Sequence, residues 1–272
     1  MNFVWLDIAV RVLLGSTLVM AQAVLLNWLG VPFAAITLFA GVAAYGAVAG
    51  VAPVIVALAL LEAAFLLLVR PLPQDRYLLL SLASLALMRS AVGAVNRFGG
   101  QLGTASVSTL IPAQRPTSAF PFALALFLAA FLLLLALRHS QMGLAVDTAR
   151  IGATDFCANS MTPVGMITAL LLGAAVLLAA FAGAVQGAYA GWIDPNVFRI
   201  DYAITMLVAT LVIGRMPIRG ALLAMAFFVF PDFFSSALGY NRTASAHIRE
   251  ILWGAAIIFL AGRGTSTARG NQ

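Results

Sequence analysis

The sequence predicts an all-α membrane protein, a polytopic bundle of transmembrane helices. Its composition is the first reason: 63% of the 272 residues are hydrophobic and 9% are charged, whereas soluble domains are about half apolar and about a quarter charged. The distribution of these residues is the second. Apolar runs of the roughly 20 residues that cross a bilayer as a helix recur from end to end, with short polar breaks between them.

Hydropathy and helix-breaking residues divide the chain into about nine membrane segments, some of them broken or re-entrant. The breaks at Gly30–Pro32 and Gly50–Pro53 separate the first three. Segment 3–29 has no A-x-A cleavage site and is expected to be a retained helix. No long polar stretch remains, so residues 1–272 are expected to form a single transmembrane domain. The predicted segments are 3–29, 31–50, 51–69, 77–95, 117–137, 164–190, 197–214, 218–240 and 248–262.

The ionisable residues exclude several classes of protein. All 15 basic residues are Arg, so the chain lacks the Lys with which a Walker-type ATPase holds phosphate. Cys157 is the only cysteine, and His139 and His247 are far apart, so we expect neither a disulfide, nor a metal site, nor an enzyme. Because the Arg residues are scattered, we expect them to meet the headgroups of the lipid bilayer and not nucleic acid.

The distribution of Arg also predicts the orientation of the chain. The loops 70–76, 138–163 and 215–219, together with the tail 263–272, contain eight Arg, and we place them on the cytoplasmic side. Arg97, Arg115, Arg199, Arg242 and Arg249 then lie on the opposite side. Loop 138–163 is the only long cytoplasmic loop, and its length suits the docking of a soluble partner.

Three stretches, in order, resemble one family. The first is 72–83, which is similar to L-R-G-D-Y-F-A-I-V-T-L-A and is followed by Arg89 and by a glycine-rich loop at 99–103. The second is loop 138–163, similar to F-G-R-A-L-R-A-I-R-E-N-E-x-A-A, and the third is 193–198, similar to I-S-P-D-S-F. Together they resemble the M-type permease subunits of branched-chain amino-acid ABC importers.

This resemblance implies a multi-pass permease subunit of the bacterial plasma (inner) membrane, which forms half of a translocation pathway. The solute would be a branched-chain amino acid or a related small, more apolar compound. The implied partners are a second homologous permease subunit, two ATP-binding subunits and an extracytoplasmic solute-binding protein. The chain itself would need no cofactor, because ATP and Mg would bind the ATPase subunits. The coupling loop 138–163 would contact those subunits through Gly143, Arg150, Asp155 and Ala158.

If the chain lines a solute pathway, we expect six residues in its walls. The family's G-Q-L-S-L-G-H stretch corresponds to 30–36 here, where apolar residues replace Gln, Ser and His. Fewer polar groups remain to replace the water around a polar solute, which favours a more apolar acid. Arg89 has no acid at helical spacing, so it either binds a carboxylate, pairs with Glu62 or Asp201, or extends to the outer face. The expected wall residues are Phe33, Ser81, Ser84, Arg89, Tyr202 and Thr205.

Two other classes of function fit the composition. An ion-coupled secondary transporter of a small organic solute would use Glu62, Arg89 or Asp201 and would carry matching broken helices in its two halves. A membrane scaffold without transport activity would explain neither the long loop nor the broken segments. Two packing features are expected in any case: an ion pair between Asp7 and Arg11, four residues apart, and close helix packing at Gly183–Gly187.

Overall fold

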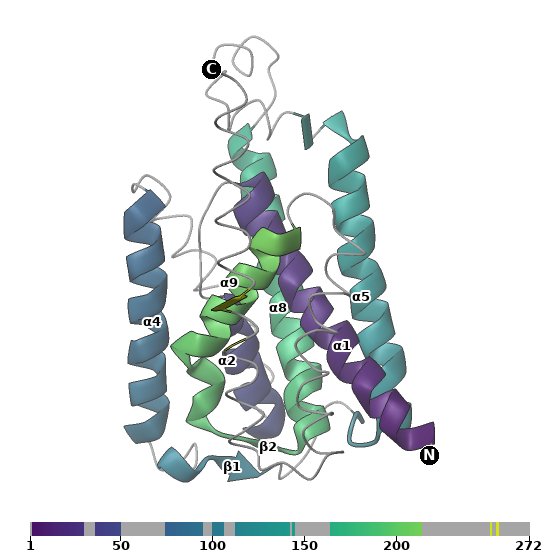
Figure 1. Ribbon diagram of the computed structural model, residues 1–272, viewed down its shortest axis with the longest axis vertical. Coiled ribbons are helices and arrows are strands. Elements are labelled where there is room, and N and C mark those ends of the chain that lie inside the picture. Colours follow the sequence, from purple (N-terminus) through teal and green to yellow (C-terminus); the bar gives the residue numbers. More distant parts are fainter. Residues whose placement is uncertain are drawn as a thin grey trace.

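The computed structural model describes residues 2–29, 36–49, 74–94, 100–105, 112–141, 143–144, 164–213, 251 and 254–255. Figure 1 shows α4 and α5 at opposite edges of a helical bundle, with α1, α2, α8 and α9 between them. The helices are α1 (Asn2–Ala23), α2 (Ile36–Ala49), α4 (Gln74–Ala94), α5 (Pro116–His139), α8 (Val164–Ala190) and α9 (Ile200–Ile213). Short elements complete them: a π-helical turn η1 (Val24–Trp28), 3-10 turns η3 (Gly100–Leu102) and η4 (Pro195–Phe198), and strands β1 (Thr104–Ala105) and β2 (Trp192–Ile193).

The structure confirms that the protein is mainly helical and that it has apolar helices long enough to span a membrane. Among the described residues, three helical stretches are long and apolar enough to cross a bilayer: Val4–Trp28, Pro116–His139 and Ala169–Ala190. Helices α2, α4 and α9 supply shorter apolar stretches. The predicted segments 51–69 and 218–240, and most of 248–262, lie outside the described residues. The total of nine segments and the single domain spanning 1–272 therefore stay predictions.

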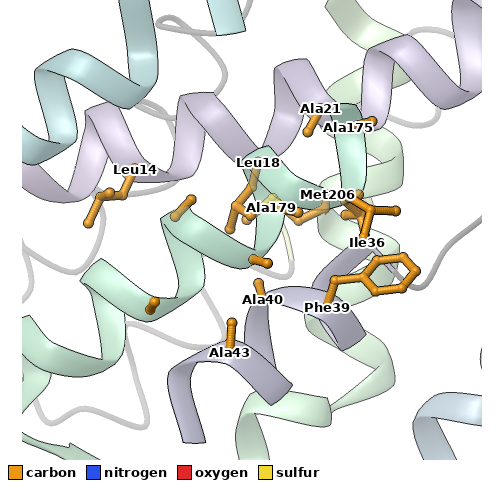
Figure 2. Close-up of a cluster of buried hydrophobic side chains, with 14 of the residues drawn as sticks. Leu14, Leu18, Ala21, Ile36, Phe39, Ala40, Ala43, Ala175, Ala179 and Met206 are labelled. Carbon is orange, nitrogen blue, oxygen red and sulfur yellow. The ribbon is translucent and has the colours of Figure 1, made fainter. Parts of the chain in front are cut away.

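Helix α1 lies inside the bundle, and α5 lies on its surface. Of the most apolar stretch of each helix, 78% is buried in α1 and 28% in α5. The exposed side chains of α5 include Phe122, Leu128 and Leu132, and such a surface is stable against lipid chains but not against water. Figure 2 shows the interior that α1 helps to form, where Leu18 of α1 lies near Ala179 of α8 and where Ala40 and Ala43 of α2 point toward α8.

Helices α2 and α8 approach each other closely through small residues. A Cβ atom added to Gly183 would overlap the backbone of Ala40, and one added to Gly187 would lie 2.8 Å from the backbone oxygen of Ala44. Both pairs advance by four residues along their helices, so α2 and α8 run parallel. Without Cβ atoms on one side, the backbones pack directly, which is a main source of helix association in lipid. The predicted close packing at Gly183–Gly187 is confirmed.

A polar cluster joins the beginning of α1 to the end of α8. Arg11 Nε donates a hydrogen bond to Asp7 Oδ1 at 3.2 Å, which confirms the predicted ion pair. The hydroxyl of Tyr189 donates a second hydrogen bond to the same carboxylate oxygen. Tyr189 is half-buried, so this carboxylate links two helices and also satisfies a phenol that is partly shielded from water.

Replacing Tyr189 with Phe is expected to lower the free energy of unfolding by about 1–3 kcal/mol, because a hydrogen bond to a charged group is lost. Thermal unfolding of the detergent-solubilised chain measures the change. Asp7→Asn and the double variant complete a mutant cycle, in which the two single effects should sum to more than the double effect. Simple additivity would show that Tyr189 and Asp7 do not stabilise each other.

Candidate solute-binding site

An open cleft lies between the second half of α4 and the turn that connects α8 to α9. Its volume is about 710 Å³, within the range of pockets that hold small organic ligands. Helix α4 supplies one wall, and η4 with the first residue of α9 supplies the other. The lining residues are Ala86, Arg89, Ser90, Gly93, Ala94, Pro195, Asn196, Phe198 and Ile200.

The wall that η4 forms is rigid because its local sequence fixes the turn. Asp194 caps the turn: its Oδ1 accepts a hydrogen bond from the backbone N–H of Asn196 at 2.9 Å. Pro195 follows at the first position of the turn, where its missing N–H costs nothing. The Asn196 side chain also bonds back, because its Nδ2 donates to Asp194 Oδ2 at 3.0 Å. Asp194 thus holds both the backbone and the side chain of Asn196.

A two-stranded ribbon holds the start of this turn in place. Strands β1 and β2 pair antiparallel, with Thr104 opposite Ile193 and Ala105 opposite Trp192. Gly103 precedes β1 with φ of +80°, and a Cβ atom there would overlap the backbone oxygen of Ile193. This position therefore requires glycine, both for its backbone conformation and for space. The described part of the glycine-rich loop, 100–103, positions the segment that leads into the cleft.

Phe198 anchors the other end of the turn to the bundle interior. Its ring is fully buried and stacks on the ring of Tyr45, with 5.8 Å between centroids and 9° between planes. The ring also covers Gly41 of α2 so closely that a Cβ atom on Gly41 would overlap it. One wall of the cleft is therefore attached to the buried helix α2.

Arg89 is the only charged residue among the described residues that line the cleft. Its Nη2 donates a hydrogen bond to Asn196 Oδ1 at 3.4 Å, and its side chain is exposed to the cleft. Within the described part of the chain no carboxylate forms an ion pair with Arg89; Glu62 lies outside that part, as does the side chain of Asp201. A guanidinium carries five N–H donors, so most of those on Arg89 are not taken up by Asn196.

Four other predicted wall residues are described, and none of them lines this cleft. Ser81 is buried, and its hydroxyl donates to the Leu78 carbonyl at 2.8 Å, while the Ser84 hydroxyl donates to the Leu80 carbonyl at 2.8 Å. Tyr202 and Thr205 are half-buried in α9 and are not among the residues that line the cleft. Phe33 lies outside the described residues. Of the six predicted residues, Arg89 is the one that the cleft contains.

Two polar residues of the cleft, Ser90 and Asn196, were not predicted from the sequence. An available signal for Asn196 was the tripeptide Asp194-Pro195-Asn196, in which a capping residue before Pro predicts a tight turn. That signal predicts the turn but not the helix it faces. Ser90 carries no signal of its own, and it follows Arg89 by one position on an exposed face of α4.

The predicted coupling residues fall mainly outside the described part of the chain. Arg150, Asp155 and Ala158 all lie outside it. Gly143 is described and is buried just beyond the end of α5, where its N–H donates to Ser140 Oγ at 3.3 Å. A Cβ atom at Gly143 would lie 3.2 Å from the ring of Trp28, so the end of η1 and the end of α5 lie at the same end of the bundle.

These observations define a class: a mainly helical protein with three helices able to cross a membrane and a cleft that exposes one Arg. Within the described ranges, no group of three or more His, Cys, Asp or Glu side chains is placed to hold a metal ion. Comparison of the chain with protein-family models, with characterised proteins and with solved structures found no match.

Proposed function

We propose that this chain is a membrane transport subunit and that a small solute with a carboxylate group binds in the cleft at Arg89. One observation carries the proposal. A cleft in an apolar helical protein exposes a guanidinium whose one hydrogen-bond partner among the described residues is a neutral amide. Ionisable residues within membrane helices are costly and usually serve a pathway, a partner or a ligand.

The chemistry of the cleft supports an anionic solute. The planar guanidinium matches a carboxylate in geometry and can donate two parallel hydrogen bonds to it. Asn196 holds Arg89 through an uncharged carbonyl oxygen, and Arg89 forms no ion pair with a described carboxylate. The remaining walls include Ala86, Gly93 and Ile200, which suit the apolar part of a small organic acid.

Within this class we favour a permease subunit of an ATP-driven importer. The resemblance to M-type permeases supports it, since two parts of the similar stretches lie beside the cleft: the end of the glycine-rich loop, 100–103, and the turn within 193–198. Arg199, which the Arg distribution assigns to the outer face, directly follows the turn η4 that lines the cleft. In this proposal a second permease subunit, two ATP-binding subunits and a solute-binding protein complete the transporter.

The carboxylate site is tested by Arg89→Gln in the purified full-length chain, with 4-methylpentanoate as the probe. We expect binding at least tenfold weaker than in the unaltered chain, because the carboxylate loses its charged partner. Arg138→Gln is the matched control: Arg138 is exposed in the last turn of α5, outside the cleft, and should leave binding unchanged. Equal binding by Arg89→Gln, or equal binding of the neutral 4-methylpentanamide, would refute the proposal.

Uptake into proteoliposomes separates the importer from the ion-coupled transporter. An importer subunit requires ATP and ATP-binding chains for uptake of the labelled acid, whereas an ion-coupled transporter takes up the acid with this chain alone and an imposed ion gradient. Gradient-driven uptake by this chain alone would replace the importer proposal with the ion-coupled one and leave the Arg89 site in place.

A further inference from the structure

We propose that the Arg89 cleft selects carboxylates without an α-ammonium group over α-amino acids; this rests on the proposed binding of a solute carboxylate by Arg89. An amino acid places its ammonium group beside its carboxylate. A site that binds one therefore needs a carboxylate or several oxygen acceptors a short distance from the group that holds the solute's carboxylate. The described residues that line the cleft include no carboxylate.

Three of the described residues that line the cleft carry a polar side chain: Arg89, Ser90 and Asn196. Arg89 offers only donors. Ser90 offers one hydroxyl and Asn196 one amide, and the other described lining residues are Ala, Gly, Pro, Phe and Ile. No Asp or Glu is among the described residues of the lining. An ammonium group in this cleft finds no carboxylate among the described lining residues to pair with, whereas an anion finds Arg89.

Asp194, the acid next to this wall, is already engaged. Its Oδ1 accepts from the Asn196 backbone N–H and its Oδ2 from Asn196 Nδ2, at 2.9 and 3.0 Å. The second bond also sets the orientation of the amide: with Nδ2 directed to a carboxylate, Oδ1 is directed to Arg89, as its 3.4 Å bond requires. Asp194 therefore fixes the position of Asn196, and it is not among the residues that line the cleft.

Charge repulsion adds to the missing acceptors. A solute carboxylate on Arg89 brings the α-ammonium of an amino acid within a few ångströms of the guanidinium, and like charges at that distance repel in a partly desolvated site. An alkanoate of the same skeleton presents only CH₂ groups at that position. These groups fit the exposed apolar side chains of Ala86 and Ile200.

The test compares leucine with 4-methylpentanoate, which is the leucine skeleton without its amino group, by direct binding to the purified full-length chain. We expect 4-methylpentanoate to bind at least tenfold more tightly than leucine. In Arg89→Gln this preference should shrink, since the variant removes both the attraction for the carboxylate and the repulsion of the ammonium.

Each result has one meaning. Leucine binding as tightly as 4-methylpentanoate would overturn the inference while leaving the Arg89 carboxylate site intact, and would point to an acid such as Glu62 or Asp201 as the ammonium partner. A preference of unchanged size in Arg89→Gln would also overturn it. Binding of neither acid would overturn both the inference and the proposed function.

Discussion

Substitution of Gly183 by alanine is expected to lower the free energy of unfolding by about 1–3 kcal/mol or more. The added methyl group would overlap the backbone of Ala40, and a backbone cannot rotate away as a flexible side chain can. Helices α2 and α8 would have to separate along their whole contact, which includes Gly187 and Ala44. Thermal unfolding in detergent should show a transition roughly 4–10 °C lower.

The same helix offers a matched control at Gly173. A Cβ atom there would meet nothing within 4 Å, so Gly173→Ala should leave the unfolding temperature unchanged or raise it slightly through higher helix propensity. The difference in unfolding temperature between the two variants separates the effect of helix–helix packing from the effect of helix propensity. Equal transitions for Gly183→Ala and Gly173→Ala would contradict the close parallel packing of α2 and α8.

The variant Asn196→Asp is expected to weaken the binding of 4-methylpentanoate by about ten- to a hundredfold. It replaces the amide oxygen that accepts from Arg89 at 3.4 Å with a carboxylate of nearly the same shape, which pairs with the guanidinium and competes with the solute. It also places a second negative charge beside Asp194. Direct binding to the purified chain measures the loss as a change in Kd.

Gln114→Glu controls for the added negative charge. Gln114 is exposed just before α5 and is outside the cleft, so this variant should keep the affinity of the unaltered chain. Loss of binding in both variants would indicate a general charge effect, and unchanged affinity in Asn196→Asp would show that the charge of Arg89 does not hold the solute.

The sequence predicts well whatever depends on local pattern. The apolar run 164–190 coincides with α8, and 117–137 falls within α5. Asp7 and Arg11 pair because four residues bring them to one face of a helix. The glycines at 183 and 187 identify a close helix contact because small residues four apart form a flat strip. Each of these predictions requires only the geometry of a single helix.

The site itself depends on contacts between distant parts of the chain. Arg89 meets Asn196 across 107 positions, and no periodicity shows that α4 faces the turn between α8 and α9. Ser81 and Ser84 were expected in a wall because of their polarity, but their hydroxyls bond to carbonyls of their own helix, as Ser in a helix commonly does. Which face of α4 meets the bundle is decided by tertiary packing alone.

The burial of α2 bears on how the protein is made. Helix α2 is buried along its described length, where Phe39, Ala43 and Val48 are almost fully covered by other parts of the chain. Its main neighbour is α8, and the ribosome adds α8 long after α2 has left the tunnel. During synthesis α2 is therefore complete before its main packing partner exists. Changes at Gly183 or Gly187 should consequently act first on assembly, with the unpaired chain removed by membrane proteases before it reaches its folded form.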